Sequence, residues 1–282
     1  MSDKRSDYVK RNDFLICVDS DGCAMDTMNI KHFRCFGPCM VAEWGLEPWR
    51  EAILERWNEI NLYTMTRGIN RFKGLAKALR EIQETYCEIE ELETLEQWVE
   101  ETPELSNEAL RNKIAEADSV CLRKALSWSC SVNQSVEELD EAEKQPFPGV
   151  KEALKEAYQI ADVAVVSSAN PEAVMKEWET HGLLDYTDVV LAQDSGSKSY
   201  CISRLLKRGY APEKVLMCGD APGDLEAAKQ NGVCFYPILA DREAESWKEF
   251  RETGLKHLLE QTYSGPYQRE KTEQFLMRLK ED

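Results

Sequence analysis

The chain has 282 residues, 43% of them hydrophobic, which allows one large domain or two smaller ones with a buried core. Its formal net charge of -17 at pH 7 makes the surface repel nucleic acid and anionic membranes, so we expect neither as a partner. No apolar run approaches the roughly 20 residues of a membrane span, and the polar N-terminus shows no signal sequence, which favours a cytoplasmic protein.

Residues 15–18 form an apolar run too short for a helix, and the run ends in Asp19-Ser20-Asp21-Gly22. This pattern predicts a buried strand that brings two carboxylates to the edge of a sheet. In an extended chain, alternation would point both carboxylates the same way. Carboxylates this close repel unless a cation or a shared proton separates them, which indicates a hard metal ion, a nucleophile with an acid/base partner, or both. A simple turn after a strand is the alternative.

Residues from about 28 to 145 show helical patterns and hardly any strand pattern. Apolar residues recur every three or four positions in 51–60, 74–87 and 108–128, which predicts helices there. Two prolines and a glycine in 145–150 then predict a linker.

Strands and helices alternate after this linker. Strands are predicted at 163–166, 188–192, 214–218 and 233–238, and helices at 171–181, 198–208 and 222–231. Such alternation predicts a parallel sheet with right-handed crossovers. We expect the first strand to join this sheet, so the helical segment is an insertion after it. Residues 263–282 are compatible with either a terminal helix or a loose tail.

Polar side chains follow the predicted strands, where the ligand crevice of an open parallel sheet lies. Ser167 and Ser168 follow one strand, Asp220 and Asp224 follow another, and Lys198 precedes a helix. Each has a purely structural explanation. Such a serine can cap a helix, the Asp224 carboxylate can favour a helix N-terminus, and a lysine is commonly solvated. Their joint placement favours a functional site.

These motifs together resemble those of the haloacid dehalogenase-like hydrolases. The family's Asp-x-Asp-Gly, serine, lysine and Gly-Asp-x-x-x-Asp motifs correspond to residues 19–22, Ser167, Lys198 and 219–224. The resemblance implies an α/β fold, with a Rossmann-like parallel sheet, helices on both faces and an inserted all-helical cap. The core would comprise 1–27 and 146–282, and the cap 28–145, as in members similar to β-phosphoglucomutase and phosphoglycolate phosphatase.

The resemblance also implies an enzyme, a phosphatase that hydrolyses a small phosphorylated metabolite. Asp19 would be the nucleophile and form an aspartyl-phosphate. Asp21 would protonate the leaving oxygen and later activate water. An acid/base carboxylate at this position distinguishes phosphatases from the dehalogenases and phosphonatases of the family, so Asp21 favours phosphate esters.

The cofactor implied by the resemblance is Mg²⁺, which would neutralise carboxylates facing a phosphate dianion. Its ligands would be the Asp19 carboxylate, the Asp21 backbone carbonyl and Asp220, with Asp224 as a ligand or support. Ser167 and Lys198 would bind phosphoryl oxygens, with backbone N–H groups near Ser168 assisting.

In the cap, residues 64–71 resemble the loop by which β-phosphoglucomutase-like members bind a substrate phosphate. Arg71 matches the binding arginine, and Arg67 is a possible companion. Solvated arginines that pair with nearby glutamates are an equally good explanation.

Two other functions remain open. One is a phosphotransferase or mutase that passes the phosphoryl group to a sugar, although such members carry Glu where this chain has Gly219, which favours hydrolysis. The other is a non-catalytic binding protein built on the same fold. The retained motif residues argue against it.

Overall fold

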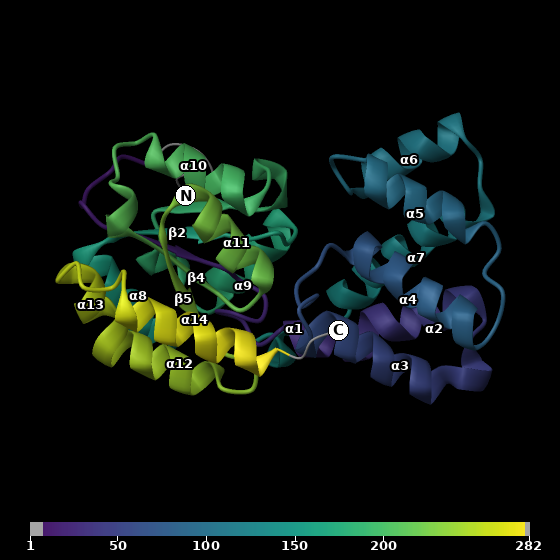
Figure 1. Cartoon of the computed structure of the whole chain (residues 1–282), viewed down its shortest axis with the longest axis horizontal. Coiled ribbons are helices and arrows are strands. Elements are labelled where there is room, and N and C mark those ends of the chain that lie inside the picture. Colours follow the sequence, from purple (N-terminus) through teal and green to yellow (C-terminus); the bar gives the residue numbers. More distant parts are fainter. Residues whose placement is uncertain (1–7, 280–282) are drawn as a thin grey trace. The chain divides into compact units, whose positions relative to one another are not determined.

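The computed structural model describes residues 8–279. Two parts of the chain lie outside the described residues. They are residues 1–7, in the N-terminus that was expected to have no signal sequence, and residues 280–282, at the end of the C-terminal segment. The described chain divides into two compact units (Figure 1). We call 8–28 with 141–279 the α/β unit, and 29–140 the helical unit. Among residues 8–279, no helix is long and apolar enough to cross a membrane.

The α/β unit is built on a five-stranded parallel sheet in the order β3-β2-β1-β4-β5. The strands are β1 (Leu15–Val18), β2 (Asp162–Val166), β3 (Val189–Leu191), β4 (Val215–Gly219) and β5 (Cys234–Pro237). The predicted strands and their parallel arrangement are confirmed. The first strand lies at the centre of the sheet, paired with β2 on one side and β4 on the other.

Alternate residues of the strands pack on opposite faces of the sheet, and helices cover both faces (Figure 1). Ile16 and Val18 belong to a core that includes α8 (Val150–Ile160), α9 (Pro171–Thr180), α12 (Glu243–Glu249) and α13 (Leu255–Leu259). Leu15 and Cys17 belong to the core of the other face, with α10 (Lys198–Leu206), α11 (Pro222–Asn231) and α14 (Pro266–Arg278).

The C-terminal segment, for which the sequence left two possibilities, is a helix. Phe275 of α14 is buried and packs edge-on against Phe235 of β5, with ring centroids 5.4 Å apart. This contact holds the helix on the sheet because it buries a large aromatic side chain.

The helical unit has its own core, in which three tryptophans are buried: Trp57, Trp98 and Trp128. Phe72 packs edge-on against two of them, with centroids 5.1 Å from Trp98 and 6.2 Å from Trp128. The unit's α-helices are α2 (Gly37–Trp44), α3 (Arg50–Asn58), α4 (Arg71–Thr85), α5 (Leu92–Glu101), α6 (Asn107–Glu116) and α7 (Val120–Glu137). Short α1 (Met28–Lys31) joins the two units, and π-helical turns occupy His32–Phe36 and Glu59–Tyr63.

The helical spacing over 108–128 is carried by two helices, because the chain leaves the helix after Glu116 and begins α7 at Val120 with Ser119 at the N-cap. The predicted linker 145–150 is ordered against the loop after β1. There Asp26 N donates to Gln145 O, and Phe147 N donates to Ala24 O.

Candidate active site

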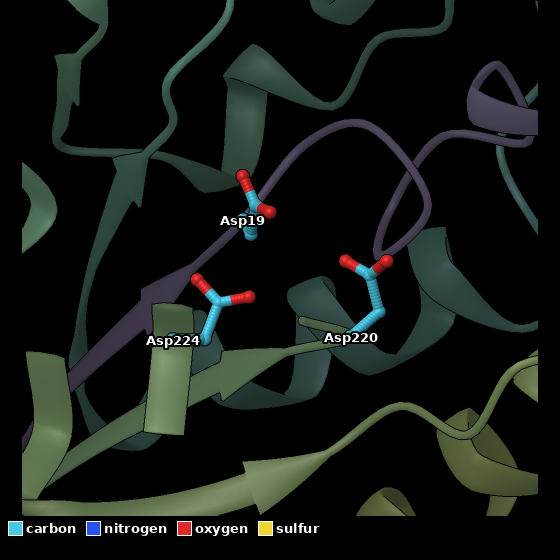
Figure 2. A group of neighbouring side chains, drawn as sticks. All are labelled: Asp19, Asp220 and Asp224. Carbon is cyan, nitrogen blue, oxygen red and sulfur yellow. The ribbon is translucent and has the colours of Figure 1, made fainter. Parts of the chain in front are cut away.

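Three carboxylates converge at the carboxyl end of the sheet (Figure 2). Asp19 directly follows β1, where its N–H still donates to Cys218 O at 3.0 Å. Asp220 directly follows β4, and Asp224 lies in the first turn of α11. All three are buried, and one oxygen from each lies within 4.8 Å of the others. The order of the strands explains this convergence, because β1 and β4 are neighbours in the sheet.

The Asp224 side chain occupies the space beside Gly219. A Cβ atom on residue 219 would lie only 2.3 Å from both Cβ and Cγ of Asp224. Asp224 Oδ2 also accepts a hydrogen bond from Ala221 N at 3.1 Å, which fixes the carboxylate over the start of α11. Glycine is therefore needed at 219 for Asp224 to take this position.

Lys198 supplies the positive charge of the group. It is the first residue of α10, behind the N-cap Ser197. Its Nζ donates to Asp19 Oδ2 at 2.7 Å and to Asp224 Oδ1 at 2.5 Å, and its side chain is only 13% exposed. Burial disfavours the ammonium, but the facing carboxylates outweigh burial and raise the pKa of Lys198 above its ordinary value.

Burial dominates the electrostatics of the two carboxylates that Lys198 contacts. It raises the pKa of Asp19 to about 6, and Lys198 counteracts part of that shift. Burial likewise raises the pKa of Asp224, again opposed by Lys198 and reinforced by the charge of Asp220. One lysine therefore only partly offsets the cost of burying three acidic groups together.

Asp21 lies outside this group of three side chains. The chain does not continue extended past β1, as the simple alternation argument assumed, but turns at Ser20, whose carbonyl accepts three N–H groups from Cys23, Ala24 and Met25. The Asp21 carboxylate accepts a hydrogen bond from Thr27 Oγ1 at 2.7 Å. Its predicted roles as acid/base and as backbone ligand stay predictions.

Ser167 and Ser168 lie at the same end of the sheet, because they follow β2, the other neighbour of β1. Ser167 is 3% exposed, and its Oγ accepts from Ala169 N at 3.2 Å in a local turn. Ser168 is exposed. The phosphate contacts predicted for both stay predictions.

Arg67 and Arg71 belong to the helical unit. Arg67 is 3% exposed and donates to Leu62 O at 2.7 Å. Arg71 donates to Ser129 Oγ at 3.1 Å and Asn133 Oδ1 at 2.7 Å. Both guanidinium groups thus have partners within the helical unit, and their predicted contact with substrate is untested.

Sequence reasoning missed three side chains that hold the loop after β1: Thr27, Trp178 and Trp247. The tryptophans lie far along the chain from the loop, and their helical spacing indicates only core packing. Thr27 lies near the loop in sequence, but nothing in its neighbours marks it as the partner of Asp21. Only the folded chain reveals these contacts.

The donor set suits a hard divalent cation. Carboxylate oxygens are the ligands that Mg²⁺ prefers, and its Mg–O distances of about 2.1 Å separate opposite ligands by roughly 4.2 Å. The Asp19, Asp220 and Asp224 oxygens lie within 4.8 Å of one another, so all three face one small space. A cation would also relieve the repulsion that one lysine leaves.

The family model for haloacid dehalogenase-like hydrolases matches residues 69–238, more than half of the chain. The chain therefore belongs to the haloacid dehalogenase-like hydrolase family, as its motifs indicated. No curated protein matches the chain in sequence.

Solved structures share the fold of this chain. A hydrolase of the haloacid dehalogenase-like family from Xanthomonas campestris has 14% identity and a TM-score of 0.53 over 93% of this chain and 100% of that chain. A Thermotoga maritima protein provisionally assigned as a β-phosphoglucomutase has 17% identity and a TM-score of 0.51, over 85% and 99% of the two chains. A provisional phosphoglycolate phosphatase from Lactobacillus delbrueckii subsp. bulgaricus has 15% identity and a TM-score of 0.50, over 80% and 85%. Identities this low establish the shared fold only.

Proposed function

We propose that this hydrolase is a magnesium-dependent phosphatase that cleaves the phosphate monoester of a small metabolite. The observation that carries the proposal is the buried group of Asp19, Asp220 and Asp224, with Lys198 Nζ within 2.7 Å of two of them. The site lies at the carboxyl end of a parallel sheet, where ligands bind. These acids would repel a phosphoryl group by themselves, so the arrangement suits phosphoryl transfer once a bound divalent cation offsets their charge.

Asp19 acts as the nucleophile. A carboxylate oxygen attacks phosphorus, the ester P–O bond breaks, and an aspartyl-phosphate forms. Asp21 gives its proton to the leaving oxygen and then removes one from a water molecule, whose attack on phosphorus releases phosphate and restores Asp19. The Thr27 hydroxyl supports this role because it fixes one oxygen of the Asp21 carboxyl group at 2.7 Å.

Mg²⁺ would be held by the carboxylates of Asp19, Asp220 and Asp224 and by the Asp21 backbone carbonyl. When bound, it supplies positive charge beside the phosphoryl oxygens. Ser167 and Lys198 bind the remaining oxygens, and backbone N–H groups near Ser168 assist. The Lys198 charge is suited to this role because nearby carboxylates favour its protonated form.

The proposed substrate is a small phosphorylated metabolite, and no observation favours transfer to a sugar over transfer to water. The formal net charge of -17 supports the expectation that nucleic acid and anionic membranes are not partners. A cytoplasmic location is proposed from the sequence alone.

Hydrolysis of p-nitrophenyl phosphate by the full chain, with and without Mg²⁺, tests the proposal. We expect turnover that disappears with chelator and returns with Mg²⁺, and that is lost in Asp220→Ala. Absence of turnover at every Mg²⁺ concentration, in protein folded by circular dichroism, would contradict the proposal. Turnover that accelerates when a sugar acceptor is added would favour the phosphotransferase alternative instead.

A further inference from the structure

Two buried indole groups hold the loop that carries Asp19 and Asp21. Trp178 Nε1 of α9 donates to Ser20 Oγ at 2.9 Å, and Trp247 Nε1 of α12 donates to Cys23 O at 2.9 Å. Both tryptophans are 0% exposed and belong to the core of one sheet face. The two bonded positions, Ser20 and Cys23, bracket Asp21 and Gly22.

The first bond connects to the nucleophile through a single residue. Ser20 N donates to Asp19 Oδ1 at 2.7 Å, while Lys198 holds Oδ2 at 2.7 Å. Each oxygen of the Asp19 carboxylate therefore has its own donor. Ser20 keeps its N–H directed at Oδ1 only while the turn keeps its shape, and the Trp178 indole anchors the Ser20 side chain in that turn.

The second bond is on the far side of Asp21. Between Ser20 and Cys23 the chain passes through Gly22, whose φ of 79° lies in the left-handed region. Gly22 N donates to Met25 O at 2.9 Å, and Cys23 N to Ser20 O at 3.3 Å. The Trp247 indole fixes the carbonyl at the end of this turn, and with it the direction in which Asp21 leaves the backbone.

We propose that Trp178 and Trp247 are positioning residues for the proposed phosphatase reaction: Trp178 acts on the nucleophile Asp19 through Ser20, and Trp247 acts on the acid/base Asp21 through Cys23. The proposal rests on the function proposed above. The competing explanation is that each bond merely satisfies a buried donor, as buried indoles generally require. The two explanations predict different kinetics.

The experiment compares Trp178→Phe and Trp247→Phe with a matched control, Tyr263→Phe. Phenylalanine keeps an aromatic ring in place but removes the N–H donor together with one ring of the buried indole. The Tyr263 hydroxyl donates to Phe235 O of β5 at 2.9 Å in the same core, so its removal reproduces the loss of one buried bond at a strand instead of the loop. Steady-state rates are measured for p-nitrophenyl phosphate and phenyl phosphate, together with the midpoint of urea unfolding.

We expect the tryptophan variants to lose more stability than Tyr263→Phe, because they also leave a cavity. Only the tryptophan variants should lose kcat, by about tenfold to 100-fold with KM nearly unchanged. Trp178→Phe should slow both esters equally, because nucleophilic attack is needed for each. Trp247→Phe should slow phenyl phosphate about tenfold more than p-nitrophenyl phosphate, because the poorer leaving group depends on the acid. Losses of kcat no larger than in Tyr263→Phe, or equal sensitivity to the leaving group in both variants, would overturn the proposal.

A second readout needs no turnover and separates failure of this inference from failure of the proposed function. In protein labelled with ¹⁵N-tryptophan, Ser20→Ala and Asp19→Asn should each shift the indole N–H signal of Trp178 and leave that of Trp128 in place. Trp128 is the reference because its indole donates to Phe36 O within the helical unit. An unmoved Trp178 signal rejects the link to Asp19 whether or not the enzyme is active. If the wild-type protein is inactive but the Trp178 signal shifts in these variants, the phosphatase assignment is rejected and the Trp178–Ser20–Asp19 link stands.

Discussion

At the scale of single residues, the candidate site buries acidic side chains next to a lysine of opposite charge. Asp19, Asp220 and Asp224 bring three acids together, and Lys198 bridges two of them. The lysine is held as an ammonium by these neighbours, even though burial alone would disfavour its charge. Removal of Lys198 would take away the ammonium that offsets the acids, whereas removal of one acid would relieve part of their repulsion, so substitutions here should affect catalysis and stability together.

Asp19→Asn should abolish phosphatase activity, with a loss of about 10³-fold or more, because the amide cannot attack phosphorus and contributes no charge to a bound cation. Initial rates with p-nitrophenyl phosphate measure the loss. Asp13→Asn is the control, since Asp13 lies near β1 but its side chain is 72% exposed. If Asp19→Asn retained a tenth of wild-type activity, Asp19 would not be the nucleophile.

Gly219→Ala should lower kcat and weaken Mg²⁺ binding, because the new methyl group would lie 2.3 Å from the Asp224 side chain and displace it. We expect the Mg²⁺ dissociation constant from calorimetry to rise about tenfold or more. Gly223→Ala is a matched control in the same segment, where an added Cβ meets nothing within 4 Å. Equal behaviour of the two variants would mean that Asp224 tolerates displacement.

The sequence predicted the residues of this site that directly follow a strand or lie close to its end. Asp19, Asp220 and Asp224 each follow or lie near the end of an apolar strand, so topology alone brings them together. The turn at Ser20 was not predictable from alternation, because alternation describes only an extended chain and the Trp178 indole becomes a neighbour of Ser20 only after folding. Contacts of this kind have no periodic signature in the chain.

At the scale of elements, the strands were predicted more accurately than the helical segments. The strands are fully buried apolar runs, and their ends are marked by Gly, Pro and Asp. In contrast, the apolar spacing of 108–128 continues through the break at residues 117–119, where the chain takes extended backbone angles at Ala117 and Ser119. Hydrophobic periodicity alone does not detect such a break.

Helix α14 illustrates an element that the sequence left undecided. Its pattern is weak because most of its residues are polar; its buried residues are Lys271 and Phe275, and Phe275 packs against Phe235 of the sheet. Stability of this helix therefore depends on tertiary packing more than on local propensity.

Phe275→Ala should reduce the free energy of unfolding by about 3–5 kcal/mol, the usual cost of truncating a buried phenylalanine. Urea denaturation followed by circular dichroism measures it. Met277→Ala serves as the control because Met277 lies on the same helix but is 84% exposed, so we expect a change within about 0.5 kcal/mol. Similar effects of the two substitutions would show that α14 is not held by its buried face.

At the scale of the whole molecule, the protein is strongly acidic both overall and at the candidate metal site. The chain carries a formal net charge of -17, and at the site three acids are buried within 4.8 Å of one another. A ligand that binds only the folded protein stabilises it in proportion to the logarithm of its concentration. A divalent cation at this site should therefore raise the stability of the α/β unit.

Mg²⁺ should raise the unfolding temperature of the wild-type protein, with a gain of about 2.7 kcal/mol at 100 times its dissociation constant. Asp220→Ala should abolish most of the gain, because it removes one of the three carboxylates. Scanning calorimetry at constant ionic strength, with NaCl replacing MgCl₂ in the reference, separates specific binding from screening of the surface charge. A gain that persists in Asp220→Ala would place the cation elsewhere.

The central position of β1 has a consequence for how the protein is made. Leu15 of β1 pairs with Asp162 of β2 and Val215 of β4, and the whole helical unit, residues 29–140, is synthesised between them. The helical unit can finish folding before β2 and β4 pair with β1, since contacts between distant residues form late. The nascent chain therefore carries an apolar strand without its partner strands until β2 and β4 have been synthesised. A fragment released before residue 220 contains Asp19 but neither Asp220 nor Asp224, so we expect the proposed hydrolysis only after translation has passed residue 224.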